Sequence, residues 1–317
     1  YYMTASEYAV YQDELNGKKV GIGIIPFFNS QDMAIYVAEI SENSPAALSG
    51  LQKGDKITVI NEEKVTAYNY SDLLEQLTGD QLSTVTITFE RDGASKTVSV
   101  VKGYTAQSVY SNLNGTVGYI KITEFYATTA DQLKKAVENL SNQGATSLVF
   151  DVRGTSAGTI EYAATTLDVL VPVANEGSGA LATALAKDGT EKQTFTADAD
   201  SVSMPMLVLV NGETAGPAEL FACDLRDYGK AQLVGQKTAG NGTMQQAFPL
   251  SDGGAIVLTM AVIKPYVSES YNRVGLTPDV EVALSDEKQT ILPLLSQAED
   301  DQFQKAYTML TGETGEE

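Results

Sequence analysis

The chain has 317 residues, a length typical of about two domains, and carries 21 Lys+Arg against 41 Asp+Glu for a net charge of −20. This acidity argues against nucleic acids and anionic membrane surfaces as partners, because binding either one needs a basic face. The absence of histidine excludes Ser-His-Asp and Cys-His mechanisms and histidine-ligated metal sites. The single cysteine, Cys223, excludes an internal disulfide and thiolate zinc clusters. Any chemistry must therefore rest on Ser, Thr, Lys, Asp, Glu or Tyr. We expect no cofactor.

The first 19 residues predict one short amphipathic helix. Residues 4–7 resemble an N-cap, and Asn16-Gly17 ends the apolar spacing. The longest apolar stretches, such as 255–263, are much shorter than the roughly 18 residues that a membrane helix needs. We expect no membrane span, and we expect any signal segment or anchor to have been removed or to lie upstream of these residues.

From residue 20 the pattern changes to short strands around two helices. Residues 20–25 read as a glycine-punctuated strand, and Ser44-Pro45 opens a short helix that runs to 51. A second, capped helix is predicted over 71–77. Further strands are predicted over 34–40, 56–60, 84–89 and 96–101, the last two joined through an Asp92-Gly93 turn.

The order of these elements, with GIG at 21–23 and SPAALSGLQKGDKITVI at 44–60, resembles a PDZ domain over residues 20–103. The resemblance implies that a glycine loop of Gly21, Ile22 and Gly23 holds the C-terminal carboxylate of a peptide, which adds a strand beside Ile24. It also implies that Leu73 and Leu77 face the peptide groove. The alternative is that the glycines make a tight turn and the two leucines belong to a core stripe.

After residue 103, apolar strands alternate with helices, which predicts an α/β core whose sheet is layered with helices. The last helix is expected over 290–310, followed by an acidic tail. Strands are predicted over 118–122, 147–152, 206–210, 231–234 and 255–261, and helices over 131–142 and 218–227.

Four stretches of this second half carry a further resemblance: GYIKITEF at 118–125, FDVRGTSAGT at 150–159, the long block at 207–250 and GLTPDVEV at 275–282. Together they are similar to the C-terminal processing peptidases, or tail-specific proteases, which join a PDZ domain to an α/β serine peptidase core. The expected organisation is an N-terminal helical segment (1–19), a PDZ domain (20–103, a small barrel-like sheet with two helices), a protease-like core (104–285) and a C-terminal helix with the acidic tail (286–317). The resemblance implies a serine nucleophile, a lysine base of lowered pKa and a supporting glutamine.

The chain departs from the family pattern at both reacting positions. The segment Thr214-Ala215-Gly216-Pro217-Ala218-Glu219 aligns with Ser-Ala-Ser-Ala-x-Glu, so Gly216 stands where the nucleophile belongs. The segment GNGTMQ at 240–245 aligns with Gly-Lys-Gly-x-x-Gln, so Asn241 stands where the base belongs and only Gln245 keeps its type. Glycine has no attacking atom, and an amide cannot accept the proton at neutral pH.

The oxyanion side departs as well. The family's Asn-Pro-Gly-Gly turn is here Thr155-Ser156-Ala157-Gly158, and Pro217 removes the backbone N–H that the alignment assigns to the oxyanion hole. These changes predict a natural pseudoenzyme that has lost proteolytic activity. The competing hypothesis is a relocated active site in which Thr214 attacks with help from Lys237 or Lys264. The plainer interpretation is that Thr214 caps the following helix and the lysines lie on solvated edges.

Three other features carry weaker signals. Cys223 fits core packing better than reactivity, and Asp151 with Arg153 forms either an ion pair or a support for the neighbouring turn. Residues 198–201 lack the pattern of a calcium loop, so no metal site is expected.

The predicted function is recognition of protein C-termini or unstructured peptides as a scaffold or regulator. The alternatives are an active serine-type endopeptidase with a relocated nucleophile, and a purely structural part of an assembly. The resemblance further implies an extracytoplasmic place in a bacterial cell envelope, allows a homo-oligomer, and leaves room for a membrane anchor outside this sequence.

Overall fold

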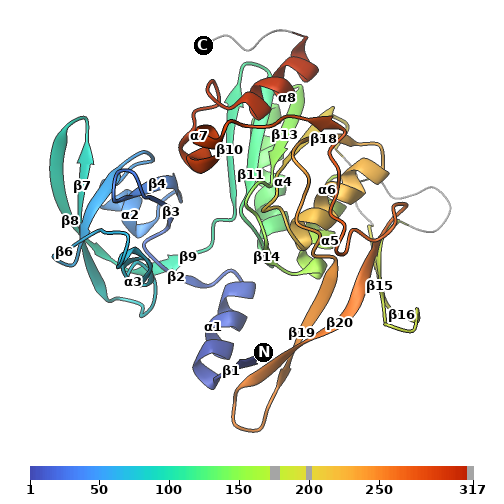
Figure 1. The fold of residues 1–317 in the computed structure, drawn as a ribbon, viewed down its shortest axis with the longest axis horizontal. Helices are drawn as coiled ribbons and strands as arrows, with labels where there is room; N and C mark the ends of the chain where they lie inside the picture. Colours follow the sequence, from blue (N-terminus) through green and yellow to red (C-terminus); the bar gives the residue numbers. More distant parts are fainter. Residues whose placement is uncertain (172–178, 198–201, 313–317) are drawn as a thin grey trace. The chain divides into compact units, whose positions relative to one another are not determined.

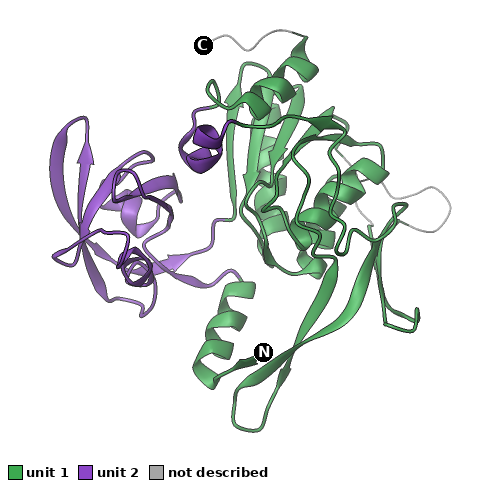
Figure 2. Ribbon diagram, viewed as in Figure 1, with its two compact units in different colours: residues 1–16, 108–284, 297–317 green, residues 17–107, 285–296 purple. Residues whose placement is uncertain are grey.

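A computed structural model describes residues 1–171, 179–197 and 202–312. The chain forms two compact units (Figure 2). Unit 1 comprises Tyr1–Asn16, Ser108–Leu284 and Gln297–Glu317, and unit 2 comprises Gly17–Gln107 and Ser285–Ser296. No helix in the described ranges combines the length and apolar character that crossing a membrane requires.

Unit 2 is built on a mainly antiparallel sheet in which β3, β4, β5, β7 and β8 lie in that order. Its core gathers apolar side chains from the sheet and from helix α3, including Ile35, Ile57 and Leu73. The strands are β2 (Lys19–Gly21), β3 (Ile24–Asn29), β4 (Ala34–Ile40), β5 (Lys56–Ile60), β6 (Glu63–Lys64), β7 (Thr84–Arg91), β8 (Ala94–Val101) and β9 (Gly103–Thr105); the helices are α2 (Pro45–Leu48), α3 (Tyr70–Glu75), α7 (Asp286–Thr290) and the 3-10 helix η1 (Leu292–Leu294).

The strand expected over 20–25 is wrong, because the backbone breaks between β2 and β3. Gly23 has a φ of +82°, and a Cβ there would come within 2.3 Å of the Ser44 Cβ. β2 therefore leaves the main sheet and pairs with β9, while β3 becomes the edge strand of the main sheet. The Asp92-Gly93 turn is as predicted, with positive φ at both residues.

Unit 1 contains a six-stranded sheet in the order β10-β11-β13-β17-β18-β21. Only β10 is antiparallel to its neighbour; all other pairs are parallel. Figure 1 shows helices packed on this sheet. The elements are β10 (Val109–Asn114), β11 (Val117–Ile122), β12 (Glu124–Phe125), α4 (Thr129–Asn142), β13 (Ser147–Asp151), β14 (Ala157–Gly158), α5 (Ile160–Asp168), β17 (Met206–Val210), α6 (Pro217–Asp227), β18 (Ala231–Gly235), β21 (Val280–Glu281) and α8 (Asp301–Thr311).

Alternate residues of the central strands face two different cores. Phe150 and Val208 join the core that α4, α5 and α6 complete. Val149 and Leu209 point the other way, into a smaller core closed by Phe303 of α8. Both faces are covered, which explains why β13 and β17 are buried along their whole length. The α/β fold predicted for this half is confirmed.

A second, antiparallel sheet contains β1 (Tyr2–Met3), β20 (Ala255–Pro265), β15 (Ala180–Leu185) and β16 (Glu191–Thr196), with β19 (Thr243–Pro249) on the other side of β20. Figure 1 shows β19 and β20 as a long hairpin with α1 (Ala5–Leu15) beside it. Thr4 is the N-cap of α1, within the predicted N-cap region, and it forms a capping box with Glu7. Tyr8 and Tyr11 pack against a small buried cluster of Met3, Ala255 and Val257.

The single C-terminal helix predicted over 290–310 is wrong. The chain instead forms α7, then η1, then an extended stretch, and α8 starts only after its N-cap Asp300. Pro293 explains the interruption, because proline cannot continue the hydrogen-bond ladder of a helix. The final residues 313–317 of the expected acidic tail lie outside the described residues.

Candidate functional site

The aligned positions meet where the parallel strands β13, β17 and β18 end. Three loops follow these strands: 152–156, 211–216 and 236–242. The carboxyl ends of strands in an open α/β sheet are the usual place for a ligand site. The fold therefore brings the residues that differ from the family pattern together at one edge of the sheet.

Gly216 is the N-cap of α6, with φ 59° and ψ −115°. A Cβ built on it would lie 3.9 Å from Asn241 Nδ2 and 4.0 Å from the carbonyl oxygen of Ser156, at ordinary contact distance. The structure thus brings Gly216, Asn241 and the Thr155-Ser156 turn together. A side chain at 216 has room, but neither 216 nor 241 supplies a nucleophile or a base.

Glu219, a residue whose role the sequence reasoning missed, ties these loops to α6. Its carboxylate is fully buried and accepts N–H bonds from Gly216 (3.1 Å), Gly240 (2.8 Å) and Asn241 (2.7 Å). The Thr238 hydroxyl donates to it as well. The signal was available, because a glutamate three residues after an N-cap is typical of a capping box.

The loop that carries Asn241 has little freedom to move. A Cβ on Gly240 would come within 2.8 Å of the Gly275 nitrogen, and one on Gly242 within 2.8 Å of the Asn272 nitrogen. On the other side, the buried Tyr271 hydroxyl donates to the carbonyl oxygen of Gly216 (3.2 Å). The backbone around both reacting positions is therefore held by close packing.

The turn expected on the oxyanion side is held from two directions. The N–H of Ala215 donates to the Thr155 carbonyl (3.0 Å), and the Thr155 hydroxyl donates to the Ile122 carbonyl (2.6 Å). Ala157 and Gly158 form β14, which pairs with β12. A Cβ on Gly158 would collide with the Phe125 carbonyl oxygen at 2.1 Å, so only glycine fits there.

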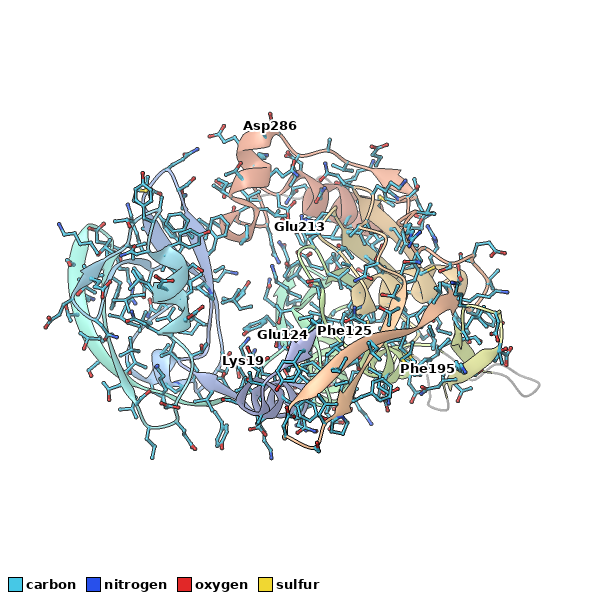
Figure 3. All side chains as sticks on the ribbon, turned by 60° about the horizontal axis from the view of Figure 1, so that its bottom comes forward. Lys19, Glu124, Phe125, Phe195, Glu213 and Asp286 are labelled. Carbon is cyan, nitrogen blue, oxygen red and sulfur yellow. The ribbon has the colours of Figure 1, made fainter. Side chains whose placement is uncertain are left out.

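Figure 3 labels Glu124 and Phe125 on β12 and Glu213 on the loop between β17 and α6, which mark two of the segments around this turn. Pro217 is buried at the first turn of α6, where it removes one backbone donor next to Gly216. The neighbouring N–H groups are already engaged: Ala215 donates to the Thr155 carbonyl, Gly216 to the Glu219 carboxylate and Ala218 to the Ala215 carbonyl.

Thr214 does not cap α6, which corrects that expectation. It is fully buried; its hydroxyl donates to the Val152 carbonyl (3.0 Å) and accepts the N–H of Asn211 (3.0 Å). The capping role falls to Gly216 with Glu219. Lys237 and Lys264 are exposed, as the plainer interpretation predicts.

Gln245 lies exposed on β19, opposite Thr259 of β20. The Asn241 side chain accepts a hydrogen bond from the Thr243 hydroxyl (2.9 Å). No hydrogen bond joins Gln245 to Asn241 within the ranges the structure covers. The retained glutamine is therefore not engaged with the residue it would be expected to assist.

The weaker candidates resolve as structural residues. Cys223 is buried, and burial followed by the charges of Asp227 and Asp224 raises its pKa to about 12. The Arg153 guanidinium contacts Asp151 (2.7 Å) and Asp300 (2.6 Å) in a buried network. Across the described part of the chain no cluster of carboxylate or cysteine side chains is arranged to hold a metal ion, and residues 198–201 lie outside it.

In unit 2, the glycine loop lies next to the end of α3. The N–H of Ile22 already donates to the Leu77 carbonyl (3.1 Å), and Gly21 forms a bridge with Thr78. Within the described residues, no acceptor takes a hydrogen bond from the N–H of Gly23. Of the three loop residues expected from the sequence, Gly23 is therefore the one whose N–H can meet a carboxylate, together with Ile24 at the start of β3.

Leu73 and Leu77 are 0% and 3% exposed and belong to the core of unit 2. The structure thus places both side chains in the core, as the core-stripe interpretation predicts. The side chains of Tyr70 and Leu74 are half-buried and pack against the same core from α3. Helix α3 therefore presents Tyr70 and Leu74, one turn apart, beside β3.

Comparisons with known proteins agree with this architecture. The model of peptidase family S41 matches residues 116–282, and that of the PDZ domain matches residues 20–101. The carboxy-terminal processing protease CtpA of Bacillus subtilis is 27% identical over 288 residues, 90% of this chain and 60% of that protein. The chloroplastic carboxyl-terminal-processing peptidase 3 of Arabidopsis thaliana is 28% identical over 311 residues, 88% of this chain and 56% of that protein. The chain thus spans less than two thirds of either relative.

Two solved structures support the fold. A photosystem II D1 C-terminal processing protease aligns with a TM-score of 0.54 and 24% identity, over 95% of this chain and 83% of that one. A putative S41 protease from Bacteroides fragilis aligns with a TM-score of 0.62 and 19% identity, over 93% and 83% of the two chains.

Proposed function

This chain belongs to peptidase family S41 and contains a PDZ domain, and from that premise we propose that it binds protein C-termini or unstructured peptides without hydrolysing them. In this view it acts as a scaffold or regulator and not as a protease. The binding part rests on the PDZ domain, which in general adds a peptide as a strand to its sheet edge. The loss of hydrolysis rests on the residues at the aligned reacting positions.

The observation that carries the proposal is the pairing of Gly216 with Asn241. The two positions adjoin, with 3.9 Å between a Cβ at 216 and Asn241 Nδ2, so the site keeps the proximity that a nucleophile and base need. Yet the pair has no hydroxyl to attack and no amine to accept a proton. Removing the nucleophile of a serine peptidase lowers turnover by about a millionfold, which leaves no useful hydrolysis.

A relocated nucleophile finds no support in the geometry. The Thr214 hydroxyl is buried and engaged with Val152 and Asn211, so it lacks both access and a neighbouring base. Lys237 and Lys264 are both exposed, and among the described residues the partners of the Thr214 hydroxyl are Val152 and Asn211 and neither lysine.

The first experiment is mass spectrometry of an unstructured protein with an apolar C-terminus after long incubation with this chain at a high enzyme ratio. We expect the substrate to stay intact. Gly216→Ser/Asn241→Lys, made with and without Pro217→Ala, should produce C-terminus-dependent fragments, because the Glu219 bonds and the flanking glycines already hold the backbone. Gly216→Ala/Asn241→Lys is the matched control, since it adds the Cβ but no hydroxyl.

Specific cleavage by rigorously purified wild type would contradict the proposal, and Thr214→Val would then test the relocated nucleophile. The binding part has its own measurement: peptides with an apolar C-terminus should bind, and amidation of that terminus should abolish binding. If no peptide binds, a purely structural role is favoured.

The extracytoplasmic location in a bacterial envelope, a membrane anchor outside this sequence and self-association are further proposals that rest on the family resemblance. Cell fractionation and analytical ultracentrifugation measure them directly.

A further inference from the structure

The outer edge of β3 is where a peptide strand would pair, and its backbone groups alternate in direction. β3 is the terminal strand of its sheet, with β4 on its inner side. The N–H of Ser41 donates to the Gly23 carbonyl (2.8 Å), so the Gly23 carbonyl points inward, toward the chain that continues β4. By alternation Ile24 directs its N–H and carbonyl outward, where a peptide could meet them.

Pro26 is the next residue that faces outward. Its opposite neighbour on β4 is Val37, and both polar backbone groups of Val37 are engaged with the 54–55 turn: its N–H donates to Asp55 (3.0 Å) and its carbonyl accepts from Gly54 (2.8 Å). Pro26 is thus in a non-hydrogen-bonded pair and points to the free edge. Proline has no N–H, so this edge offers a carbonyl but no donor at the second outward position.

The third outward residue, Phe28, is covered by an aromatic stack. The rings of Phe28 and Tyr70 lie 4.0 Å apart between centroids, at an interplanar angle of 6°. Both rings also pack on the core of unit 2. The stack joins β3 to the first turn of α3, while the Ile22–Leu77 hydrogen bond joins the glycine loop to the end of that helix. The surface strip between β3 and α3, which extends from the glycine loop to the Phe28–Tyr70 stack, is therefore closed at both ends.

We propose that this PDZ domain recognises only the last three residues of a partner chain, an inference that rests on the peptide binding proposed above. The terminal carboxylate accepts the N–H groups of Gly23 and Ile24, and the terminal residue donates its own N–H to the Ile24 carbonyl. The third residue from the end donates to the Pro26 carbonyl and receives nothing in return. Beyond it, the Phe28–Tyr70 stack makes the peptide leave the sheet.

The test measures affinity against peptide length. Fluorescence polarisation of the full chain uses three, five and seven-residue peptides that share one apolar C-terminal tripeptide, each also as its C-terminal amide. For wild type we expect affinity to change by less than about threefold from the shortest to the longest peptide, less than one added hydrogen bond would contribute.

Two substitutions test the two parts of this proposal. Pro26→Val restores the outward N–H opposite the third peptide residue, so it should raise the affinity for peptides of all three lengths alike, by the roughly threefold to tenfold that one hydrogen bond contributes. Tyr70→Ala opens the far end, so it should raise the affinity for the seven-residue peptide by about tenfold while hardly changing that for the tripeptide. Tyr68→Ala is the matched control, because Tyr68 lies just before the same helix and is 99% exposed. Should Tyr70→Ala fail to fold, Tyr70→Leu keeps the core contact and removes the stack.

The outcomes separate the two proposals. Wild-type affinity that rises more than about tenfold with length would overturn the three-residue limit and leave peptide binding intact. Binding of long peptides by the Tyr70→Ala variant alone would also overturn it, because the wild-type strip would then be closed to every peptide. If neither wild type nor the opened variant binds any peptide, the proposed function itself fails.

Discussion

Asp224 is the residue least satisfied by its surroundings. It lies on α6, fully buried, and its Oδ1 accepts the N–H of Tyr266 (3.1 Å). In the described part of the chain its Oδ2 finds no hydrogen-bond partner. Burial, aided by the nearby charge of Asp227 and opposed by the Tyr266 N–H, raises the pKa of Asp224 well above its usual value. The carboxyl is thus held in its neutral form over a range where the unfolded chain would ionise it.

The raised pKa of Asp224 predicts that this carboxyl lowers the free energy of unfolding increasingly as pH rises, and that Asp224→Asn removes the effect. Because the folded pKa lies above the unfolded value, the folded state binds the extra proton, and wild-type stability falls as pH rises above about 4 until the folded pKa is reached. Asparagine does not titrate, so the stability of the variant relative to wild type should grow by about 1.4 kcal/mol for each pH unit in that window. Urea unfolding at a series of pH values measures the slope.

The slope is the diagnostic quantity, since the amide brings its own unpaired N–H and can shift all values by a constant. Asp131→Asn, at an exposed position on α4, is the comparison for replacing a carboxylate by an amide. If the difference in free energy of unfolding between Asp224→Asn and wild type does not vary with pH, the raised pKa of Asp224 is contradicted.

At the scale of elements, a buried ion network fastens α8 to the end of β13. Arg153 contacts Asp151, the last residue of β13, and Asp300 at the N-cap of α8, and it donates to Gln302 (2.9 Å). Burial alone would raise the pKa of Asp151, but the charge and hydrogen bonds of Arg153 outweigh it and hold that pKa well below its usual range. The helix is thus held by charge as well as by Phe303.

Arg153→Met should lower the free energy of unfolding by about 3–5 kcal/mol at pH 7, because it leaves two buried carboxylates without a cationic partner. The depressed pKa of Asp151 stabilises the fold above the unfolded pKa and loses this effect as pH falls. The gap between variant and wild type should therefore shrink as pH drops from about 5 to about 3. Lys135→Met, at an exposed position on α4, is the control for removing a cation. A gap that stays constant with pH would rule out the charge argument.

Element prediction succeeded where the signal is local. β4, β5 and β17 have the predicted bounds, because each is a run of apolar residues between turn residues. The strand over 20–25 failed because residue alternation cannot reveal that Gly23 turns to a positive φ against Ser44. Helix α5 and the strands β15 and β16 were missed, since they lie in stretches with weak periodicity.

At the scale of the whole molecule, the site was only partly predictable. The family resemblance assigned 216 and 241 to the nucleophile and base positions, and their loops do adjoin. The role of Thr214 could not be read from its neighbours, because its hydroxyl bonds to Val152, 62 residues away. Tyr70 and its stack on Phe28 likewise depend on how α3 packs on β3, which sequence spacing does not show.

The net charge of −20 should act on peptide association as a whole-molecule field. Acidic side chains outnumber basic ones within the PDZ domain as well. If upstream peptide residues leave the sheet after the third position, their charges still feel this field although they make no contact. A peptide with lysines upstream of a fixed tripeptide should associate about tenfold faster than one with glutamates at low salt.

Stopped-flow association of these two peptides at 20 mM and 1 M NaCl measures the effect. The rates should converge at 1 M, where the screening length is about 3 Å, while the dissociation rates of the two peptides stay alike at both concentrations. A rate ratio that survives 1 M NaCl, or a difference carried by dissociation, would mean that the upstream residues touch the protein. It would then argue that the peptide continues along β3 past the Phe28–Tyr70 stack.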